Sequence, residues 1–164
     1  MKTKESGFSL LEVMITVFII AIGVLGVSGM QLASLKGNQG AYHRSQANFI
    51  AADILDRMRA NSDGFENGNY NGIDTSSSSA SKPACIISPA GCNSAAVATY
   101  DIYEWLLHFP ADGNIGLVPG SSGIVSTNSI TGIATVTIQW PAIEWVDGEK
   151  TDVSKNVAVV ARLF

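Results

Sequence analysis

Apolar residues fill almost the whole stretch from residue 8 to residue 30. A bilayer core about 30 Å thick needs roughly 20 apolar helical residues, so this stretch is long enough to span it. It contains one charge, Glu12, and a short leader with Lys2 and Lys4 precedes it. The pattern predicts a membrane-spanning helix whose leader stays in the cytoplasm, because positive charges are retained on that side.

The helical pattern continues beyond the apolar stretch as an amphipathic helix. From residue 47 to residue 58, apolar residues recur at intervals of three and four, as in a helix that rests one face on a core. They are Ala47, Ile50, Ala51, Ile54, Leu55 and Met58. The polar cluster at 61–64 should end this element. We therefore expect one helix from residue 8 to about residue 60, with only its second half packed on a globular head.

Residues 61–98 are rich in Asn, Gly and Ser and include the serine run 76–79, so they are expected to form a long loop. A short amphipathic helix is predicted at 95–109, ended by Pro110. Its apolar face comprises Ile102, Trp105, Leu106 and Phe109.

The C-terminal third alternates in the manner of β-strands. In 133–140, one face carries Ala134, Val136, Ile138 and Trp140. A second β-rich run is 156–164, and a third strand is expected near 123–127. The Asp147-Gly148 turn signal lies between the strands predicted at 133–140 and 156–164, but the connection from 140 to 156 is too long for a two-residue hairpin. The predicted fold is α+β, a long N-terminal helix packed on a small antiparallel sheet.

The expected organisation has four parts: a leader (1–7), a membrane and assembly helix (8–30), an amphipathic continuation (31–61) and an extracytoplasmic head (62–164). The chain has 164 residues, 46% of them hydrophobic, and a net charge of −4. Its few positive charges form no patch, which disfavours nucleic acid as the main partner.

The two histidines, His43 and His108, have no accompanying nucleophile or carboxylate motif, so no enzymatic activity and no cofactor are predicted. Cys85 and Cys92 enclose a short loop that contains Pro and Gly. Such a pair suits a disulfide formed in an oxidising compartment. A metal site is not predicted, because two cysteines without a nearby histidine supply too few ligands.

Glu12 separates three interpretations of the N-terminus. A secretory signal peptide, cleaved near residues 27–29, usually has an apolar region of about 7–15 residues, which is shorter than this one. A plain signal anchor explains the length but not the carboxylate. A charge at the centre of a spanning helix costs roughly 2.5–3.5 kcal/mol, less near the interface, and its default interpretation is functional.

The heptapeptide Gly7-Phe8-Ser9-Leu10-Leu11-Glu12-Val13 resembles the class III signal of type IV pilins and of the pseudopilins of type II secretion. The resemblance implies that prepilin peptidase cuts between Gly7 and Phe8 and that Phe8 is then N-methylated. It also implies that Glu12 pairs with the N-terminal amine of a neighbouring subunit. Because removing one partner of a desolvated pair leaves an uncompensated charge, such a pair would set the register of assembly.

Two further segments narrow the resemblance. They are the R-x-Q-A of residues 44–47 and the run AADILDRMRAN of residues 51–61. They are similar to the minor pilins called type IV pilus modification protein PilV. Apart from this resemblance, Arg57 and Arg59 are expected to complement the helix dipole and to pair with Asp53 and Asp56.

The resemblance implies a minor pilin that is anchored in the inner membrane with its head in the periplasm and is later part of the extracellular pilus. It would prime assembly near the tip. Its implied partners are prepilin peptidase, other minor pilins, the major pilin and the inner-membrane assembly machinery, with a tip adhesin as a further candidate. Two alternatives stay open: a type II secretion pseudopilin, and a minor pilin that captures DNA or a surface ligand. No role follows for the serine-rich loop 75–81.

Overall fold

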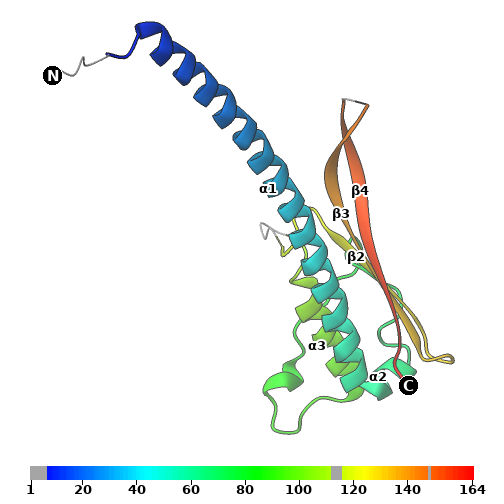
Figure 1. The fold of residues 1–164 in the computed structure, drawn as a ribbon. Coiled ribbons are helices and arrows are strands. Elements are labelled where there is room, and N and C mark those ends of the chain that lie inside the picture. The colour runs from blue at the N-terminus through cyan, green and yellow to red at the C-terminus, as the bar shows by residue number, and fades with distance from the viewer. Residues whose placement is uncertain (1–6, 112–115, 148) are drawn as a thin grey trace. The chain divides into compact units, whose positions relative to one another are not determined.

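The computed structural model describes residues 7–111, 116–147 and 149–164. The chain divides into two compact units, Met1–Tyr42 and His43–Phe164, and each is described by itself. The elements are numbered in chain order, and Figure 1 labels α1, α2, α3, β2, β3 and β4. Their bounds are α1 Leu10–Ala60, α2 Ser62–Glu66, β1 Ile73–Asp74, the 3-10 helix η1 Ala84–Ile87, α3 Ser94–Leu106, β2 Ser122–Asn128, β3 Ile133–Val146 and β4 Glu149–Arg162.

The first unit contains the N-terminal part of α1. Its apolar side chains are exposed, with Phe18 66% and Leu25 72% accessible. An 18-residue window of this helix reaches a mean hydropathy of 2.7, so the helix is long and apolar enough to cross a membrane. The predicted long apolar N-terminal helix is therefore confirmed.

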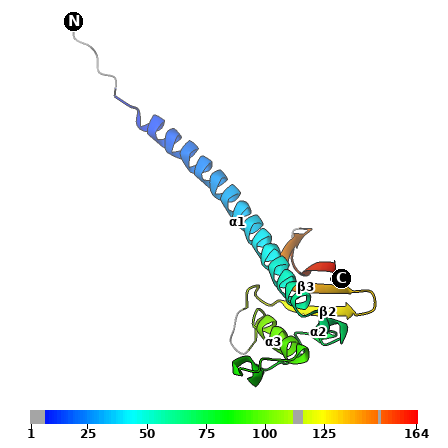
Figure 2. The same cartoon turned by 90° about the horizontal axis from the view of Figure 1, so that it is seen from below.

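The second unit is the head, a layer of helices on one face of a sheet. Four antiparallel strands lie in the order β1-β2-β3-β4. The C-terminal part of α1 and the shorter α3 lie beside this sheet and share one core with it (Figure 2). All six residues of the predicted apolar stripe on α1 are buried in the common core. The α+β fold predicted from the sequence is confirmed.

The strand pattern is also confirmed for β2 and the first half of β3. The residues predicted to share the inner face of β3 are all buried: Ala134, Val136, Ile138 and Trp140. On β2, Gly123 lies beneath α3, because a Cβ there would be 2.5 Å from the Phe109 ring and 2.7 Å from the Trp105 ring. Glycine at this position lets both rings approach the sheet backbone.

The predicted length of the last connection was wrong. Strands β3 and β4 pair as far as Val146 and Glu149, which leaves only two residues between them. Asp147 takes a left-handed conformation with φ 51°, as a tight hairpin turn requires, and Gly148 lies outside the described residues. The first half of β4, residues 149–155, was not predicted. Most of these residues are exposed, so their sequence lacks the alternation of a half-buried strand.

The expected loop 61–98 contains three short elements. Asn61 caps α2, its side-chain oxygen accepting a hydrogen bond from the Gly64 amide. Strand β1 pairs with β2, and η1 lies at the cysteine loop. These elements are too short for a periodic pattern to show, and β1 exists only through its partner strand.

Helix α3 ends at Leu106 rather than at Phe109, three residues earlier than predicted. The residue before a proline is sterically disfavoured in helical conformation, so the chain leaves the helix before Pro110. Phe109 is nevertheless 3% exposed, and its ring contacts that of Trp105 edge-on with centroids 4.8 Å apart. Of the predicted apolar face, Trp105 and Phe109 are thus buried, whereas Ile102 and Leu106 are partly buried against the core.

Candidate functional site

The predicted cleavage position lies in non-helical chain just before α1. Gly7 and Phe8 precede the helix, which begins at Leu10, and the Phe8 side chain is 82% exposed. The peptide bond between Gly7 and Phe8 is therefore not locked in helical hydrogen bonds. Leader residues 1–6 lie outside the described residues.

Glu12 lies in the first turn of α1, where the positive end of the helix dipole stabilises a carboxylate. The Ser9 carbonyl accepts hydrogen bonds from the amides of Glu12, at 3.0 Å, and Val13, at 3.3 Å. Ser9 and Glu12 have the spacing of a capping box, in which the two side chains satisfy free amides at a helix start. The Ser-x-x-Glu spacing thus gives Glu12 a second candidate role, within its own helix, which the assignment to another subunit had not considered.

A buried polar network joins α1, α3 and the chain before β1 in the head. Its centre is Asp101 on α3, which is 8% exposed. The Tyr70 hydroxyl donates to Asp101 Oδ2 at 2.5 Å, and Arg57 Nη1 lies 3.4 Å from Asp101 Oδ1. Arg57 Nε also donates to Asp53 at 3.0 Å. A buried carboxylate is tolerated when it is paired and hydrogen-bonded, and Asp101 meets both conditions.

Asn61 extends this network. Its side-chain amide donates to the Tyr70 hydroxyl at 2.9 Å and to the Ser94 carbonyl at 2.8 Å. Burial, and then the hydrogen bond to Asp101, raise the pKa of the Tyr70 phenol well above its usual value. Burial lowers the pKa of Arg57, but hydrogen bonds and charges from Asp53 and Asp101 outweigh it and raise the pKa overall.

The predicted ion pairs of the two arginines are present. Arg57 pairs with Asp53, and Arg59 pairs with Asp56 on the exposed side of the helix. The sequence did not reveal the partnership of Arg57 with Asp101, which is 44 residues away, or that of Tyr70. No local pattern connects positions so far apart. The one available signal was Asp101 itself, which lies one turn before Trp105 and therefore on the same side of the predicted apolar helix.

The histidines occupy structural positions. His108 Nε2 lies 3.4 Å from Asp53 Oδ2 at the border of the network, and His43 lies on α1, partly buried. Within the described ranges, no three His, Cys, Asp or Glu side chains gather as metal ligands would.

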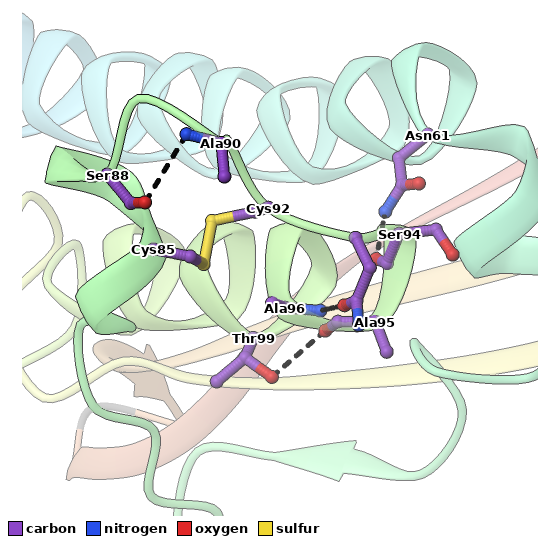
Figure 3. Close-up of a disulfide and its surroundings, with 10 residues drawn as sticks. Asn61, Cys85, Ser88, Ala90, Cys92, Ser94, Ala95, Ala96 and Thr99 are labelled. Carbon is purple, nitrogen blue, oxygen red and sulfur yellow. Dashed lines mark hydrogen bonds between the residues drawn. A yellow bond between two sulfur atoms is a disulfide. The ribbon is translucent and has the colours of Figure 1, made fainter.

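Cys85 and Cys92 form a disulfide, with their Cα atoms 5.1 Å apart (Figure 3). The bond closes the loop directly before α3. Asn93 follows it as the N-cap, and its side-chain oxygen accepts from the Ala96 amide at 2.8 Å. The disulfide thus ties the loop to the start of α3, close to the place where Asn61 holds the Ser94 carbonyl.

The comparisons with known families decide the identity. The family model described as "Prokaryotic N-terminal methylation motif" matches residues 2–28. The model described as "Type IV pilin Tt1218" matches residues 29–103. The chain belongs to the type IV pilin-like family. Membership accounts for the exposed apolar part of α1, since such a helix serves as a membrane anchor.

The two matches together extend from the leader into α3, as far as residue 103, and the type IV pilin match includes the polar network at Arg57 and Asp101. No curated protein and no solved structure matched the chain. Pilins are generally structural proteins, and the charged groups of the polar network, Asp53, Arg57 and Asp101, form ion pairs and hydrogen bonds within that network.

Proposed function

We propose that this pilin is a minor pilin of the type IV pilus, of the PilV-like group, and that it helps to prime filament assembly near the tip. The observation that carries the proposal is the coincidence of three features. The methylation motif covers residues 2–28, the Gly7–Phe8 bond lies in non-helical chain, and the helix that follows is exposed and apolar.

Before assembly, the protein is anchored in the inner membrane with the leader in the cytoplasm and the head in the periplasm. The orientation follows from Lys2 and Lys4 in the leader, because basic residues favour the cytoplasmic side. A periplasmic head also suits the Cys85–Cys92 disulfide, since that compartment is oxidising. Assembly then transfers the subunit to the extracellular pilus.

Prepilin peptidase releases the leader after Gly7, and the new N-terminal residue, Phe8, is methylated. Glu12 then faces the amine of a neighbouring subunit. Within the described part of the chain no ion pair involves Glu12, so its charge is open to such a partner. The neighbours are other minor pilins and the major pilin, assembled by the inner-membrane machinery, with a tip adhesin as a further partner.

The mature N-terminus tests this proposal. The protein should be purified from membranes of cells that contain a prepilin peptidase and measured by intact mass spectrometry. We expect loss of residues 1–7 and the added mass of one methyl group on Phe8. Gly7→Ala should retain the leader, because the family's signal has glycine before the cut. Cleavage near Gly29, or an uncut N-terminus in wild type, would contradict the proposal.

A type II secretion pseudopilin is the second candidate, because it would share the same N-terminus. The match to a type IV pilin model over residues 29–103, beyond the methylation motif, favours the pilus. Affinity purification of the mature protein from crosslinked cells separates the two. Recovery of pilus subunits supports our proposal, whereas recovery of secretion components alone supports the pseudopilin.

A further inference from the structure

The head contains a pocket of about 360 Å³ between the serine-rich loop and the end of α3. Six serine and threonine residues line it: Thr75, Ser76, Ser78, Ser79, Ser121 and Ser122. Apolar and aromatic residues after the middle of α3, including Tyr103 and Leu107, complete the lining. None of the described residues that line the pocket carries a charge. The proposed role of the protein in assembly leaves this pocket without a purpose.

Ser121 is the group in this lining that most needs a partner. The residue is 7% exposed, and its hydroxyl oxygen is buried without a hydrogen bond to any described residue. Buried hydroxyls in proteins are nearly always hydrogen-bonded, because burial removes them from water without compensation. An unsatisfied hydroxyl at the edge of a pocket therefore points to a bound molecule that completes its bonding.

Other hydroxyls of the pocket retain bonding capacity of a defined kind. Thr75 Oγ1 accepts a hydrogen bond from the Gly123 amide, and Ser78 Oγ accepts one from the Asp74 amide, both at 2.9 Å. A hydroxyl has one proton to donate besides its lone pairs, so both groups keep a donor. Ser76 instead donates to Asp74 Oδ1 at 2.7 Å and keeps lone pairs. The pocket thus offers both donors and acceptors.

We propose that this pocket binds a neutral sugar residue. The described lining residues are uncharged and give no advantage to an ionic ligand, whereas their several hydroxyl donors and acceptors match the hydroxyls of a sugar. Tyr103 and the half-exposed Leu107 provide apolar surface for the C–H faces of the ring. The volume lies at the lower end of the range usual for small-molecule sites and suits one or two sugar rings. The site is independent of how the pilus is assembled.

Saturation-transfer difference NMR on the full chain tests this proposal. The protein should be held in polyoxyethylene detergent micelles, because the head group of an alkyl maltoside is itself a sugar. The probes are D-glucose, D-galactose and N-acetyl-D-glucosamine. We expect saturable transfer to at least one of them, abolished by Ala80→Trp, which places a large ring in the same pocket.

Ser121→Ala separates binding from folding. Because its hydroxyl has no hydrogen-bond partner among the described residues, the variant should keep or raise the melting temperature while weakening sugar binding about 3- to 10-fold, the effect of one neutral hydrogen bond. Ser126→Ala, on the exposed part of β2, is the matched control and should bind as wild type does.

Three results would overturn the proposal. They are no transfer to any of the three sugars with wild type, unchanged binding by Ser121→Ala, and displacement of the sugar by N-acetyl-leucine methylamide at lower concentration than by the sugar itself. The last result would assign the pocket to an apolar peptide segment of a partner protein instead.

Discussion

The indole Nε1 of Trp105 donates a hydrogen bond of 2.9 Å to the backbone carbonyl of Ile50, and both groups are buried. The two residues are 55 positions apart in the chain and join α3 to α1. A tryptophan in a core needs a partner for its N–H, and here the partner is a helix carbonyl. This contact fixes α3 at one level along the head part of α1.

Trp105→Phe should lower the free energy of unfolding of the head by about 2–4 kcal/mol, because it removes the hydrogen bond and leaves a cavity beside Ile50. Urea unfolding followed by near-UV circular dichroism in micelles measures the change. Phe49→Ala on the same helix is the control, since Phe49 is 61% exposed and should cost less than about 0.5 kcal/mol. Equal effects of the two variants would show that the Trp105 contact does not stabilise the head.

Tyr70→Phe should destabilise the head by about 1–3 kcal/mol at neutral pH, because Asp101 loses the hydroxyl donor at its Oδ2. The double variant Tyr70→Phe/Asp101→Asn should regain only part of this stability. In it, Arg57 would face a neutral amide at position 101 instead of a carboxylate. Denaturant midpoints at pH 7 for the three proteins measure both changes. An unchanged midpoint in Tyr70→Phe would contradict the role given to this hydrogen bond.

The same tyrosine predicts the alkaline limit of stability. The pKa of Tyr70 is raised in the folded head, whereas the same phenol in the unfolded chain ionises near pH 10. The stabilising contribution of the neutral phenol is therefore complete below about pH 10 and is lost as the pH rises towards the folded pKa. Wild type should lose stability above pH 10 more steeply than Tyr70→Phe. Parallel stability curves from pH 9 to pH 11.5 would argue against this prediction.

Replacing both cysteines, as Cys85→Ser/Cys92→Ser, should cost about 2 kcal/mol, the entropy expected for so short a closed loop. The effect should be local, with faster amide exchange at the start of α3. Reductant should produce the same change in wild type and none in the double variant, and amide exchange by mass spectrometry monitors both. Reductant without effect on wild type would show that the disulfide does not stabilise this end of the head.

Glu12 has two proposed roles, and Glu12→Gln separates them. Glutamine preserves the capping-box pattern with Ser9 but removes the charge, whereas Glu12→Ala removes both. If the charge pairs with a neighbouring amine, both variants should insert in the membrane but fail to enter the pilus. Immunoblots of membranes and of sheared pili measure insertion and incorporation. Normal incorporation of Glu12→Gln with loss in Glu12→Ala would assign Glu12 to capping alone.

The periodic parts of the fold could be predicted closely. The apolar stripe of α1 and the inner face of β3 are repeated patterns, and every residue expected in them is buried. Two other parts could not be predicted: the exposed half of the β3–β4 hairpin next to its turn, and strand β1. An exposed strand and a two-residue strand carry no such pattern. They exist because a neighbouring strand supplies their hydrogen bonds.

The sequence by itself determined the apolar helix, its lone Glu12 and the motif around Gly7 and Phe8, because length, hydropathy and short-range spacing are local properties. Only the tertiary structure decided that Tyr70, Asn61 and Asp101 form one network and that Ser121, beside a pocket, has no hydrogen-bond partner among the described residues. The hydrogen bonds of this network join residues that are 9 and 31 positions apart in the chain. Their hydrogen bonds depend on which helix and strand faces meet, and no local pattern records that.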